Sequence, residues 1–286
     1  MKKLLLLLPA LLALSSRAEV PVAPGATIEK LCGGLKFTEG PAADSRGNVA
    51  FTDIPRNLIL VWSVDGKLST LRENSGGANG LWFDDRDRLL VCEEGNRRLT
   101  RSTPDGKVEV LADQFDGKKL NSPNDLWPDS KGGVYFTDPR YGKTDTMEMT
   151  VRGVYHVDAD GKVRRVLDDL KNPNGIIGTP DGKVLYVGDN AGGVTYKYSI
   201  QPDGTLADRL EFAKGHADGF TLDEKGNLYL THDGVDVVAP DGTSLGRIEV
   251  PEHPANVTFG GPANDELFIT ARTGLYRVRM AVKGAY

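Results

Sequence analysis

Cysteine and histidine are scarce in this chain of 286 residues, which has two cysteines and four histidines. Cys32 and Cys92 fall in different parts of the sequence, on segments typical of strands, so they cannot form a disulfide framework or a cysteine-based zinc site. An exported protein can carry a single disulfide, but we expect two buried free thiols. The histidines lack the close spacings of transition-metal ligands. Transition-metal chemistry therefore has little support.

Positive charge is not in excess either. The chain has a net charge of -5 and a pI near 5.5. Such a chain has no basic field that would release counterions from a phosphate backbone. We therefore expect no nucleic-acid partner.

The signature of a serine hydrolase is also missing. No Gly-x-Ser-x-Gly sequence occurs, and the serines lie in polar, turn-like surroundings. A nucleophile elbow also needs a strand-to-helix turn, and the sequence shows no long helical pattern. A serine nucleophile is therefore disfavoured.

Long hydrophobic runs are confined to the N-terminus. Two lysines precede an apolar run from Leu4 to Leu14, and small residues follow at Ser16 and Ala18. This pattern is typical of a secretory signal, and the run is too short for a typical membrane span. We expect a signal peptide over residues 1–18, cleavage before Glu19 and export to a bacterial periplasm with no membrane attachment. An uncleaved N-terminal anchor is the alternative.

A repeated pattern dominates the rest of the chain. Each repeat starts with an oxygen-bearing side chain, then a small or apolar run, a turn and an apolar strand. The six starts are Glu39-Gly40-Pro41, Asn79-Gly80-Leu81, Asn124-Asp125-Leu126, Asn174-Gly175-Ile176, Asp218-Gly219-Phe220 and Asn256-Val257-Thr258. They lie 40, 45, 50, 44 and 38 residues apart, which is the period of a four-stranded propeller blade. The sequence predicts an all-β, six-bladed β-propeller.

Turn residues divide each repeat into strands. An acid such as Asp44, Asp84, Asp129 or Asp223 follows the start by about five residues and precedes a β-rich run. Later in the repeat, an Asp-Gly pair separates two further runs, as at Asp65-Gly66 and Asp241-Gly242. Asp-Gly suits a hairpin turn in which both central residues need positive φ. The sequence therefore predicts four strands in each repeat.

The last repeat runs out of chain after its third strand, Gly274 to Val278. The segment from Thr27 to Leu31 precedes the first start and has no partner in its own repeat. We expect this N-terminal strand to close the sixth blade, since closure removes an exposed sheet edge. No interdomain linker is found, so residues 19–286 are predicted to form one domain.

The starts carry chemistry as well as structure. Equivalent residues around an axis lie on one ring, and six amide or carboxyl oxygens at one level favour a hard cation such as Ca²⁺. Only Glu39 and Asp218 among them are ionised, so together they neutralise one divalent ion. The plainer interpretation is that Asn-Gly and Asp-Gly recur because each repeat needs the same bend. That does not explain Glu39 before Gly40-Pro41 or Asn256 before Val257.

Several phrases of the chain resemble the gluconolactonase and senescence-marker-protein (regucalcin) family of six-bladed propellers. They keep their order over nearly the whole mature chain: Phe37-Thr38-Glu39-Gly40-Pro41, Cys92-Glu93-Glu94-Gly95-Asn96-Arg97-Arg98, Leu120-Asn121-Ser122-Pro123-Asn124-Asp125-Leu126, Tyr135-Phe136-Thr137-Asp138-Pro139-Arg140-Tyr141-Gly142, Pro173-Asn174-Gly175-Ile176, Ala217-Asp218-Gly219-Phe220 and Phe259-Gly260-Gly261.

This resemblance implies a divalent metal at the propeller mouth, usually Ca²⁺, with Zn²⁺, Mg²⁺ and Mn²⁺ left open. Its ligand phrases fall on Glu39, Asn174 and Asp218, and Asn124 is either a fourth ligand or a substrate contact. The implied activity is hydrolysis of a sugar lactone such as gluconolactone, with some relatives acting on other esters or organophosphates. Asp218 matches the residue assigned as general base.

Further residues are candidates for contacts with the substrate. Asparagine side chains both donate and accept hydrogen bonds, which applies to Asn79, Asn121, Asn124 and Asn256. The resemblance places Arg97, Arg140 and Tyr141 near the rim, although an arginine there is more often a solvated loop charge. Bacterial relatives often carry His where this chain has Glu94, so Glu94 either changes the tolerated substrates or is a solvated loop acid.

Other functions stay open at this stage. A pair of carboxylates such as Glu39 and Asp218 can also hydrolyse glycosides, although their Asn neighbours favour a metal. A noncatalytic exported propeller that binds a sugar, metal or protein partner is the competing class, since propellers host many functions. The sequence does not fix the oligomeric state.

Overall fold

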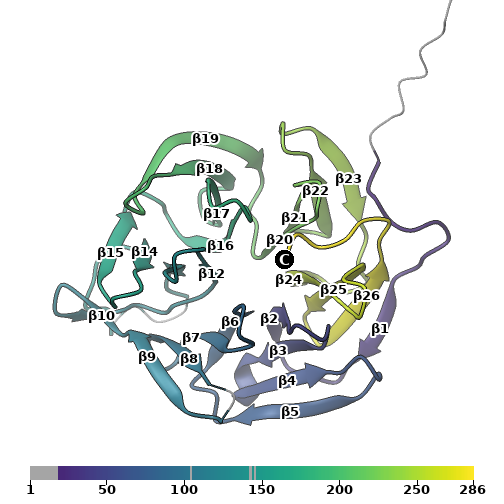
Figure 1. The fold of residues 1–286 in the computed structure, drawn as a ribbon, viewed down its shortest axis with the longest axis horizontal. Coiled ribbons are helices and arrows are strands. Elements are labelled where there is room, and N and C mark those ends of the chain that lie inside the picture. Colours follow the sequence, from purple (N-terminus) through teal and green to yellow (C-terminus); the bar gives the residue numbers. More distant parts are fainter. Residues whose placement is uncertain (1–18, 104, 142–143, 145) are drawn as a thin grey trace, which may run out of the picture.

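A computed structural model describes residues 19–103, 105–141, 144 and 146–286. Its strands form six sheets of four strands each, counted over these described residues, and the sheets are arranged around a central axis (Figure 1). The all-β, six-bladed propeller predicted from the repeat spacing is confirmed. The predicted signal peptide, residues 1–18, lies outside the described residues.

Each of the first three blades takes four strands that are consecutive along the chain. Blade 1 consists of β2 (Thr38–Ala43), β3 (Val49–Asp53), β4 (Leu58–Trp62) and β5 (Leu68–Glu73), with the short 3₁₀ helix η1 (Ile54–Arg56) between β3 and β4. Blade 2 consists of β6 (Ala78–Phe83), β7 (Leu89–Glu93), β8 (Arg98–Ser102) and β9 (Val108–Ala112). Blade 3 consists of β12 (Leu126–Pro128), β13 (Val134–Asp138), β14 (Gly153–Val157) and β15 (Val163–Leu167). A hairpin of β10 (Gln114–Phe115) and β11 (Lys118–Lys119) connects blades 2 and 3.

The last three blades follow the same order, except that the sixth is completed from the other end of the chain. Blade 4 consists of β16 (Pro173–Gly178), β17 (Val184–Asp189), β18 (Val194–Ile200) and β19 (Leu206–Lys214). Blade 5 consists of β20 (Phe220–Leu222), β21 (Leu228–Thr231), β22 (Val235–Val238) and β23 (Ser244–Ile248). Blade 6 consists of β24 (Pro254–Gly260), β25 (Glu266–Ala271), β26 (Gly274–Arg279) and β1 (Glu29–Cys32).

The ring closes as the sequence predicts. Strand β1 pairs antiparallel with β26, with Glu29 opposite Arg277 and Lys30 opposite Tyr276. Arg277 also donates a hydrogen bond of 2.7 Å from Nη2 to Glu29 Oε2. Pairing with β1 covers the edge of β26 that would otherwise be unpaired.

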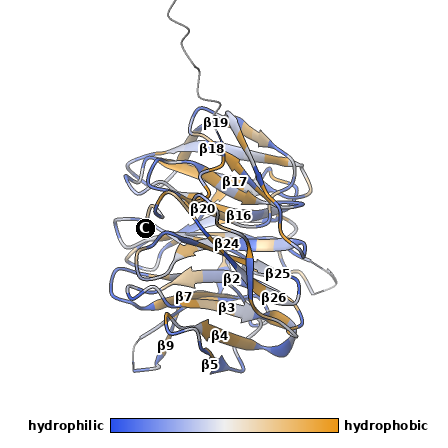
Figure 2. Cartoon of the chain, turned by 90° about the vertical axis from the view of Figure 1, so that its right-hand side faces the viewer, coloured by the Kyte–Doolittle hydropathy of each residue, from blue (hydrophilic) through white to orange (hydrophobic). Residues whose placement is uncertain are grey.

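The inner strands β2, β6, β12, β16, β20 and β24 contact one another from blade to blade and surround the axis. The second strands are buried along most of their length, and they pack between neighbouring sheets. Tyr135, Phe136 and Phe268 are examples with at most 2% of their surface exposed. Figure 2 shows the hydrophobic colours along the strands and hydrophilic colours at many of the turns. Burial on both faces explains why these strands read as apolar runs.

The Asp-Gly turns lie where the sequence predicts them, but their backbone conformation differs from the expected one. The Asp-Gly pairs do connect outer strands, yet among the described residues only the glycine of each pair has positive φ, 75° at Gly66 and 89° at Gly242. Gly66 N donates to Ser63 O at 2.9 Å, and Ser63 N donates to Lys67 O at 2.9 Å. The loop is therefore longer than two residues, and a left-handed glycine after an ordinary turn closes it.

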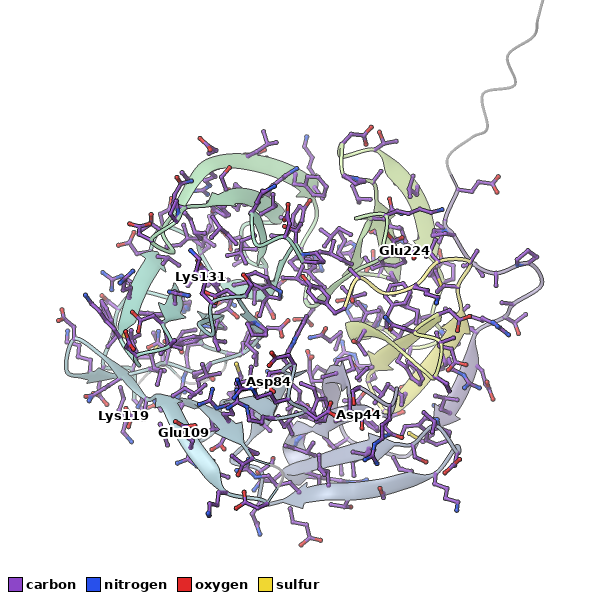
Figure 3. The ribbon with its side chains drawn as sticks, in the orientation of Figure 1. Asp44, Asp84, Glu109, Lys119, Lys131 and Glu224 are labelled. Carbon is purple, nitrogen blue, oxygen red and sulfur yellow. The ribbon has the colours of Figure 1, made fainter. Side chains whose placement is uncertain are left out.

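The turn acids lie at the end of the inner strands opposite the repeat starts. Asp44 Oδ1 accepts hydrogen bonds from the backbone N–H groups of Arg46 and Asn48, at 3.0 and 2.8 Å. Asp84 makes the same pair of bonds in blade 2. Figure 3 shows both acids toward the middle of the ring, whereas Glu109 of β9 lies at the periphery. These acids hold turns and leave the opposite end, the mouth, for other side chains.

Both cysteines are free, as expected. Cys92 lies in β7 and is buried as expected, but Cys32 is partly exposed, because it lies in β1, the outermost strand of its sheet. Burial raises the pKa of the Cys92 thiol well above its ordinary value. No helix in the described part of the chain has the length and hydrophobicity required to cross a membrane.

Candidate metal and substrate site

The inner strands bring the repeat starts together at the mouth. Glu39, Asn79 and Asn174 are the second residues of β2, β6 and β16, and Asp218 lies two residues before the start of β20. Acids that end the second strands hold the loops leading to these positions: Asp138 accepts hydrogen bonds from the N–H groups of Asn121 and Ser122, at 2.8 and 2.7 Å. The sequence analysis missed this support.

The same support recurs in other blades. Asp53 Oδ2 accepts a hydrogen bond from Lys36 N at 3.1 Å, and Asp189 Oδ1 accepts one from Asn172 N at 2.9 Å. The signal was present in the sequence, since Asp53, Asp138 and Asp189 each end a second strand. These buried acids fix the backbone immediately before the site residues.

Asn174 and Asp218 are in direct contact. Asn174 Nδ2 donates a hydrogen bond to Asp218 Oδ1, and it also donates to the Tyr141 hydroxyl at 2.6 Å. Tyr141 accepts a second hydrogen bond from Asn190 Nδ2 at 3.2 Å. Neighbouring blades therefore place one carboxylate, one carboxamide and one phenol in a connected group.

Glu39 completes the group electrostatically. Its side chain is buried, and Oε2 accepts a hydrogen bond from Gly40 N at 2.8 Å. Burial raises the pKa of the Glu39 carboxyl well above its ordinary value, and the nearby charge of Asp218 raises it further. Burial likewise raises the pKa of Asp218 to about 6, against the opposing effects of Asn174 and Arg272. The two predicted acids therefore share one site.

Asp125 is an acid of the site that sequence reasoning did not select. Its Oδ1 accepts a hydrogen bond from Leu126 N at 3.0 Å, and its Oδ2 accepts one from Asn256 Nδ2 at 3.4 Å. Burial raises the pKa of Asp125 to about 7. Its charge also acts on Glu39. The position was visible in the sequence as the residue after Asn124, where most other repeats have glycine.

Asn256 differs from its predicted position. Asn256 N donates to Thr270 Oγ1 at 3.2 Å, as Asp125 N donates to Thr137 Oγ1 at 3.1 Å. Asn256 is therefore equivalent to Asp125, one residue further along the inner strand than Asn124. The six starts do not form one level: Asp125 and Asn256 form a second level beside the first.

Two candidate residues have amide groups at the mouth. Asn79 Nδ2 donates to Glu94 Oε2 at 3.3 Å, which places the Glu94 carboxylate beside the ring of starts. The side chain of Asn124 makes no hydrogen bond with any described residue, whereas its backbone N donates to Thr137 O at 2.9 Å. The Asn124 amide is therefore free to contact a ligand.

Two other candidates support a loop. Arg97 donates to Leu120 O at 2.6 Å and to Thr146 O at 3.1 Å, and lies 3.6 Å from Glu148. Asn121 Nδ2 donates to Val151 O at 2.8 Å. Arg140 belongs to the same support, since it donates to Asn121 O at 3.1 Å and to Thr146 Oγ1 at 2.8 Å. These contacts occupy donors that the sequence analysis assigned to the substrate.

The donor set fits a divalent cation. Glu39 and Asp218 supply two carboxylates, and neither forms an ion pair with a basic side chain in the described ranges. Asn174 adds a carboxamide, and such oxygen donors are those that Ca²⁺ prefers. No cluster of three or more His, Cys, Asp or Glu side chains arranged for a metal is found among the described residues. A cation here would therefore depend on amide oxygens as well as the two acids.

Comparisons with known proteins agree on one family. A family model described as the SMP-30/Gluconolactonase/LRE-like region matches residues 37–273. The chain is 32% identical to a gluconolactonase of Zymomonas mobilis over 292 aligned residues, covering 90% of this chain and 82% of that protein. A solved gluconolactonase structure from Xanthomonas campestris has a TM-score of 0.85 and 33% identity and covers 91% of both chains.

One further structure shows the fold alone. A regucalcin from Agrobacterium tumefaciens, described as a calcium-binding protein, has a TM-score of 0.75 but only 21% identity. It covers 93% of this chain and 97% of the regucalcin.

Proposed function

The chain belongs to the SMP-30/gluconolactonase/LRE-like family, and on that premise we propose that it is a metal-dependent lactonase. It hydrolyses a sugar lactone such as gluconolactone to the aldonic acid. The observation that carries this proposal is the contact of Asn174 with Asp218, in a group that also contains Glu39. Relatives named gluconolactonase support the reaction class.

Glu39, Asn174 and Asp218 would hold the metal, for which we propose Ca²⁺. Rotation of the Asn174 amide by a half-turn would exchange Nδ2 for Oδ1 and present an oxygen. When bound, the cation supplies Lewis-acid polarisation of the lactone carbonyl and charge stabilisation for the developing oxyanion. The solved regucalcin that is described as calcium-binding supports the choice of ion only through its shared fold.

Asp218 acts as the general base in this proposal. With a pKa raised to about 6, the carboxylate is mostly ionised at neutral pH yet is more basic than an exposed aspartate. It takes a proton from a water molecule whose oxygen attacks the lactone carbonyl carbon. The ring C–O bond then breaks, and the departing alkoxide oxygen takes up a proton. The products are a carboxylic acid and a hydroxyl group.

The other mouth residues orient the sugar. Asn124 has an unoccupied amide, which donates to or accepts from a sugar hydroxyl. The Tyr141 hydroxyl contacts the Asn174 amide: it accepts from Nδ2 in the structure and can donate to Oδ1 after the half-turn. Glu94 and Asn79 form a second polar edge to which hydroxyl groups can bind. Arg97 and Asn121 contribute by holding the loop rather than by direct contact.

We further propose that the protein acts after export, with residues 1–18 removed as a signal peptide. The N-terminal sequence supports this through its lysines, apolar run and small residues. Expression of the full chain in a bacterium, followed by fractionation and N-terminal sequencing, tests it. A periplasmic protein that begins at Glu19 is expected, and a cytoplasmic protein that begins at Met1 contradicts the proposal.

Acid release from glucono-δ-lactone tests the main proposal. Purified protein should exceed the spontaneous rate, lose activity on chelation and regain it with Ca²⁺. Parallel additions of Zn²⁺, Mg²⁺ and Mn²⁺ identify the ion that restores the highest rate. Absence of activity on several aldonolactones with each metal overturns the proposal in favour of a noncatalytic propeller, and turnover of aryl esters or organophosphates alone identifies a different hydrolase.

A further inference from the structure

Hairpins at the mouth require a left-handed backbone conformation. The residue between the second and third strands has positive φ in three blades: Asn57 (58°), Arg97 (58°) and Arg272 (40°). Asparagine tolerates this conformation, whereas longer side chains are disfavoured because Cβ approaches the backbone. Of the eight non-glycine residues with positive φ in the described chain, six are Asn or Asp and only these two are Arg.

Structural contacts account for one of the two arginines. Arg97 donates to the carbonyl groups of Leu120 and Thr146 and holds their loop. Arg272 has no such contacts, since it forms no hydrogen bond or ion pair through its guanidinium with any described residue. Its Cζ lies 5.6 Å from the centroid of the Phe37 ring, and the residue is exposed. Arg272 therefore adopts an unfavourable backbone conformation, and the N–H donors of its guanidinium are available to a ligand.

The backbone of Arg272 places this charge at the candidate site. Thr38 N donates to Arg272 O at 2.9 Å, and Thr38 directly precedes Glu39. The positive charge of Arg272 also lowers the pKa of Asp218 relative to the effect of burial. The charge of Arg272 is therefore close to Asp218 and its backbone lies beside the residue before Glu39, and Arg272 pairs with neither carboxylate.

The acids around Arg272 already have partners. Glu252 lies 2.5 Å from Lys30 Nζ, in an ion pair that is held in place by a hydrogen bond from Tyr276. Asp233 lies 3.5 Å from His232 Nδ1 and 4.0 Å from Arg247. Neither Glu252 nor Asp233 is therefore left to neutralise Arg272.

Histidines extend the same side of the mouth. The rings of His216 and His232 lie 4.2 Å apart, and the charge of Arg272 acts on His253. An imidazole ring carries at least one N–H donor in either protonation state, so each of these side chains can donate a hydrogen bond to an anion. This side of the mouth, Arg272 with His216, His232 and His253, is called the basic edge.

We propose that Arg272 recognises an anionic substituent, a carboxylate or a phosphate, on the sugar lactone. This rests on the proposed lactonase function and names its substrate class as acidic sugar lactones rather than neutral ones. The planar guanidinium offers paired donors that match the oxygens of either group. The reacting carbonyl lies near Asp218 while the anionic substituent lies against the basic edge, so one molecule is held at two points.

Arg272→Asn is the decisive variant. It removes the charge and installs the residue that the equivalent hairpin already has at Asn57, so the fold should be as stable as wild type. Three lactones are compared: neutral glucono-δ-lactone, carboxylate-bearing glucaro-1,4-lactone and phosphate-bearing 6-phosphogluconolactone. We expect kcat/KM for at least one anionic lactone to fall roughly tenfold to a hundredfold, mainly through KM. The value for the neutral lactone should stay within about twofold.

Two further variants sharpen the comparison. Arg272→Lys keeps the charge and should retain part of the preference for the anionic lactone. Arg86→Asn removes an equal charge from an exposed turn at the opposite end of the ring. It should leave kcat/KM unchanged for both the neutral and the anionic lactones. Added salt should reduce the anionic preference of wild type and leave that of Arg272→Asn unchanged. The larger loss, with carboxylate or with phosphate, identifies the group.

A binding measurement separates this inference from the proposed reaction. Calorimetry with the dianion glucarate, compared with neutral sorbitol, should show weaker glucarate binding for Arg272→Asn than for wild type. Equal loss of turnover on neutral and anionic lactones, or unchanged glucarate affinity, overturns the role of Arg272 while lactonase activity stands. Absence of turnover of every lactone by the wild-type protein overturns the proposed lactonase function. The glucarate comparison then decides by itself whether Arg272 binds an anion.

Discussion

Asn256 and Asp125 belong to blades on opposite sides of the ring, yet their side chains are hydrogen bonded, with Asn256 Nδ2 3.4 Å from Asp125 Oδ2. The bond spans 131 positions of sequence. Asn256 also interacts with Glu39. Asn256 therefore connects Glu39, in the first level of the site, to Asp125 in the second level. Asp125 is buried and has no cationic partner among the described residues.

Asp125→Asn should stabilise the chelated protein at high pH. Burial raises the folded-state pKa of Asp125 to about 7, so ionisation of this group destabilises the fold progressively as pH rises from about 4 to 7. The variant removes a cost of a few kcal/mol at pH 8 and of only about 1 kcal/mol at pH 4.5. Thermal unfolding should show a difference of roughly 5 °C or more at pH 8 and a clearly smaller one at pH 4.5. A difference of equal size at both pH values would contradict this explanation, and the exposed Asp85→Asn should follow wild type throughout.

Asp218→Asn should separate the role of Asp218 as general base from its role as metal ligand. The amide retains an oxygen donor but cannot accept a proton from water, so kcat should fall at least about a hundredfold. Calorimetric titration with Ca²⁺ should show that most of the metal affinity remains. Wild-type turnover in this variant would remove Asp218 as the general base.

Glu39→Gln should weaken the metal more than the fold. Loss of one of two carboxylates lowers the charge available to a divalent ion, and we expect affinity for Ca²⁺ to fall roughly tenfold or more. The measurement is the rise in unfolding temperature with added Ca²⁺, which reports binding to the folded state. Glu109→Gln, on the periphery in Figure 3, serves as the control and should keep the wild-type rise. An undiminished rise in Glu39→Gln would place the ion elsewhere.

Removal of β1 should open the sixth blade. A chain that starts at residue 34 lacks Glu29–Cys32 and exposes the edge of β26, whereas a chain that starts at residue 27 keeps the strand. The shorter chain should unfold at least about 10 °C lower and self-associate through the free edge. Calorimetry and analytical ultracentrifugation of the two chains measure this, and identical behaviour would show that β1 is dispensable.

The two thiols should react at very different rates. Burial raises the pKa of both thiols, but Cys32 is partly exposed, whereas Cys92 is buried and its pKa lies well above the ordinary value, which suppresses the reactive thiolate. Titration with a chromogenic disulfide should detect about one thiol in the native protein and two in denaturant. Detection of none in denaturant without reductant would indicate a disulfide.

Spacing in the sequence was sufficient for the architecture. Starts that recur every 38 to 50 residues and the Asp-Gly pairs between outer strands predict the blades correctly, because each blade repeats the same local solution. The unpaired third strand of the last repeat also predicts closure by an N-terminal strand, since a free edge is costly.

The site is only partly predictable for physical reasons. Asn256 is displaced by one residue from its expected level, and a shift of one along a strand is invisible to a count of spacings. The engagement of Arg97 and Asn121 depends on a loop that approaches from blade 3, far along the chain. Contacts between distant segments arise from tertiary packing, which no local pattern encodes.

Closure by β1 also imposes an order on assembly. Glu29 and Arg277 are separated by 248 positions, so the circle cannot be completed until almost the entire chain is available to fold. Blades 1 to 5 can fold one after another, but β1 stays unpaired until β24, β25 and β26 have formed. The sixth blade is completed last, by strands from both ends of the chain, and until then the edge of β26 stays unpaired.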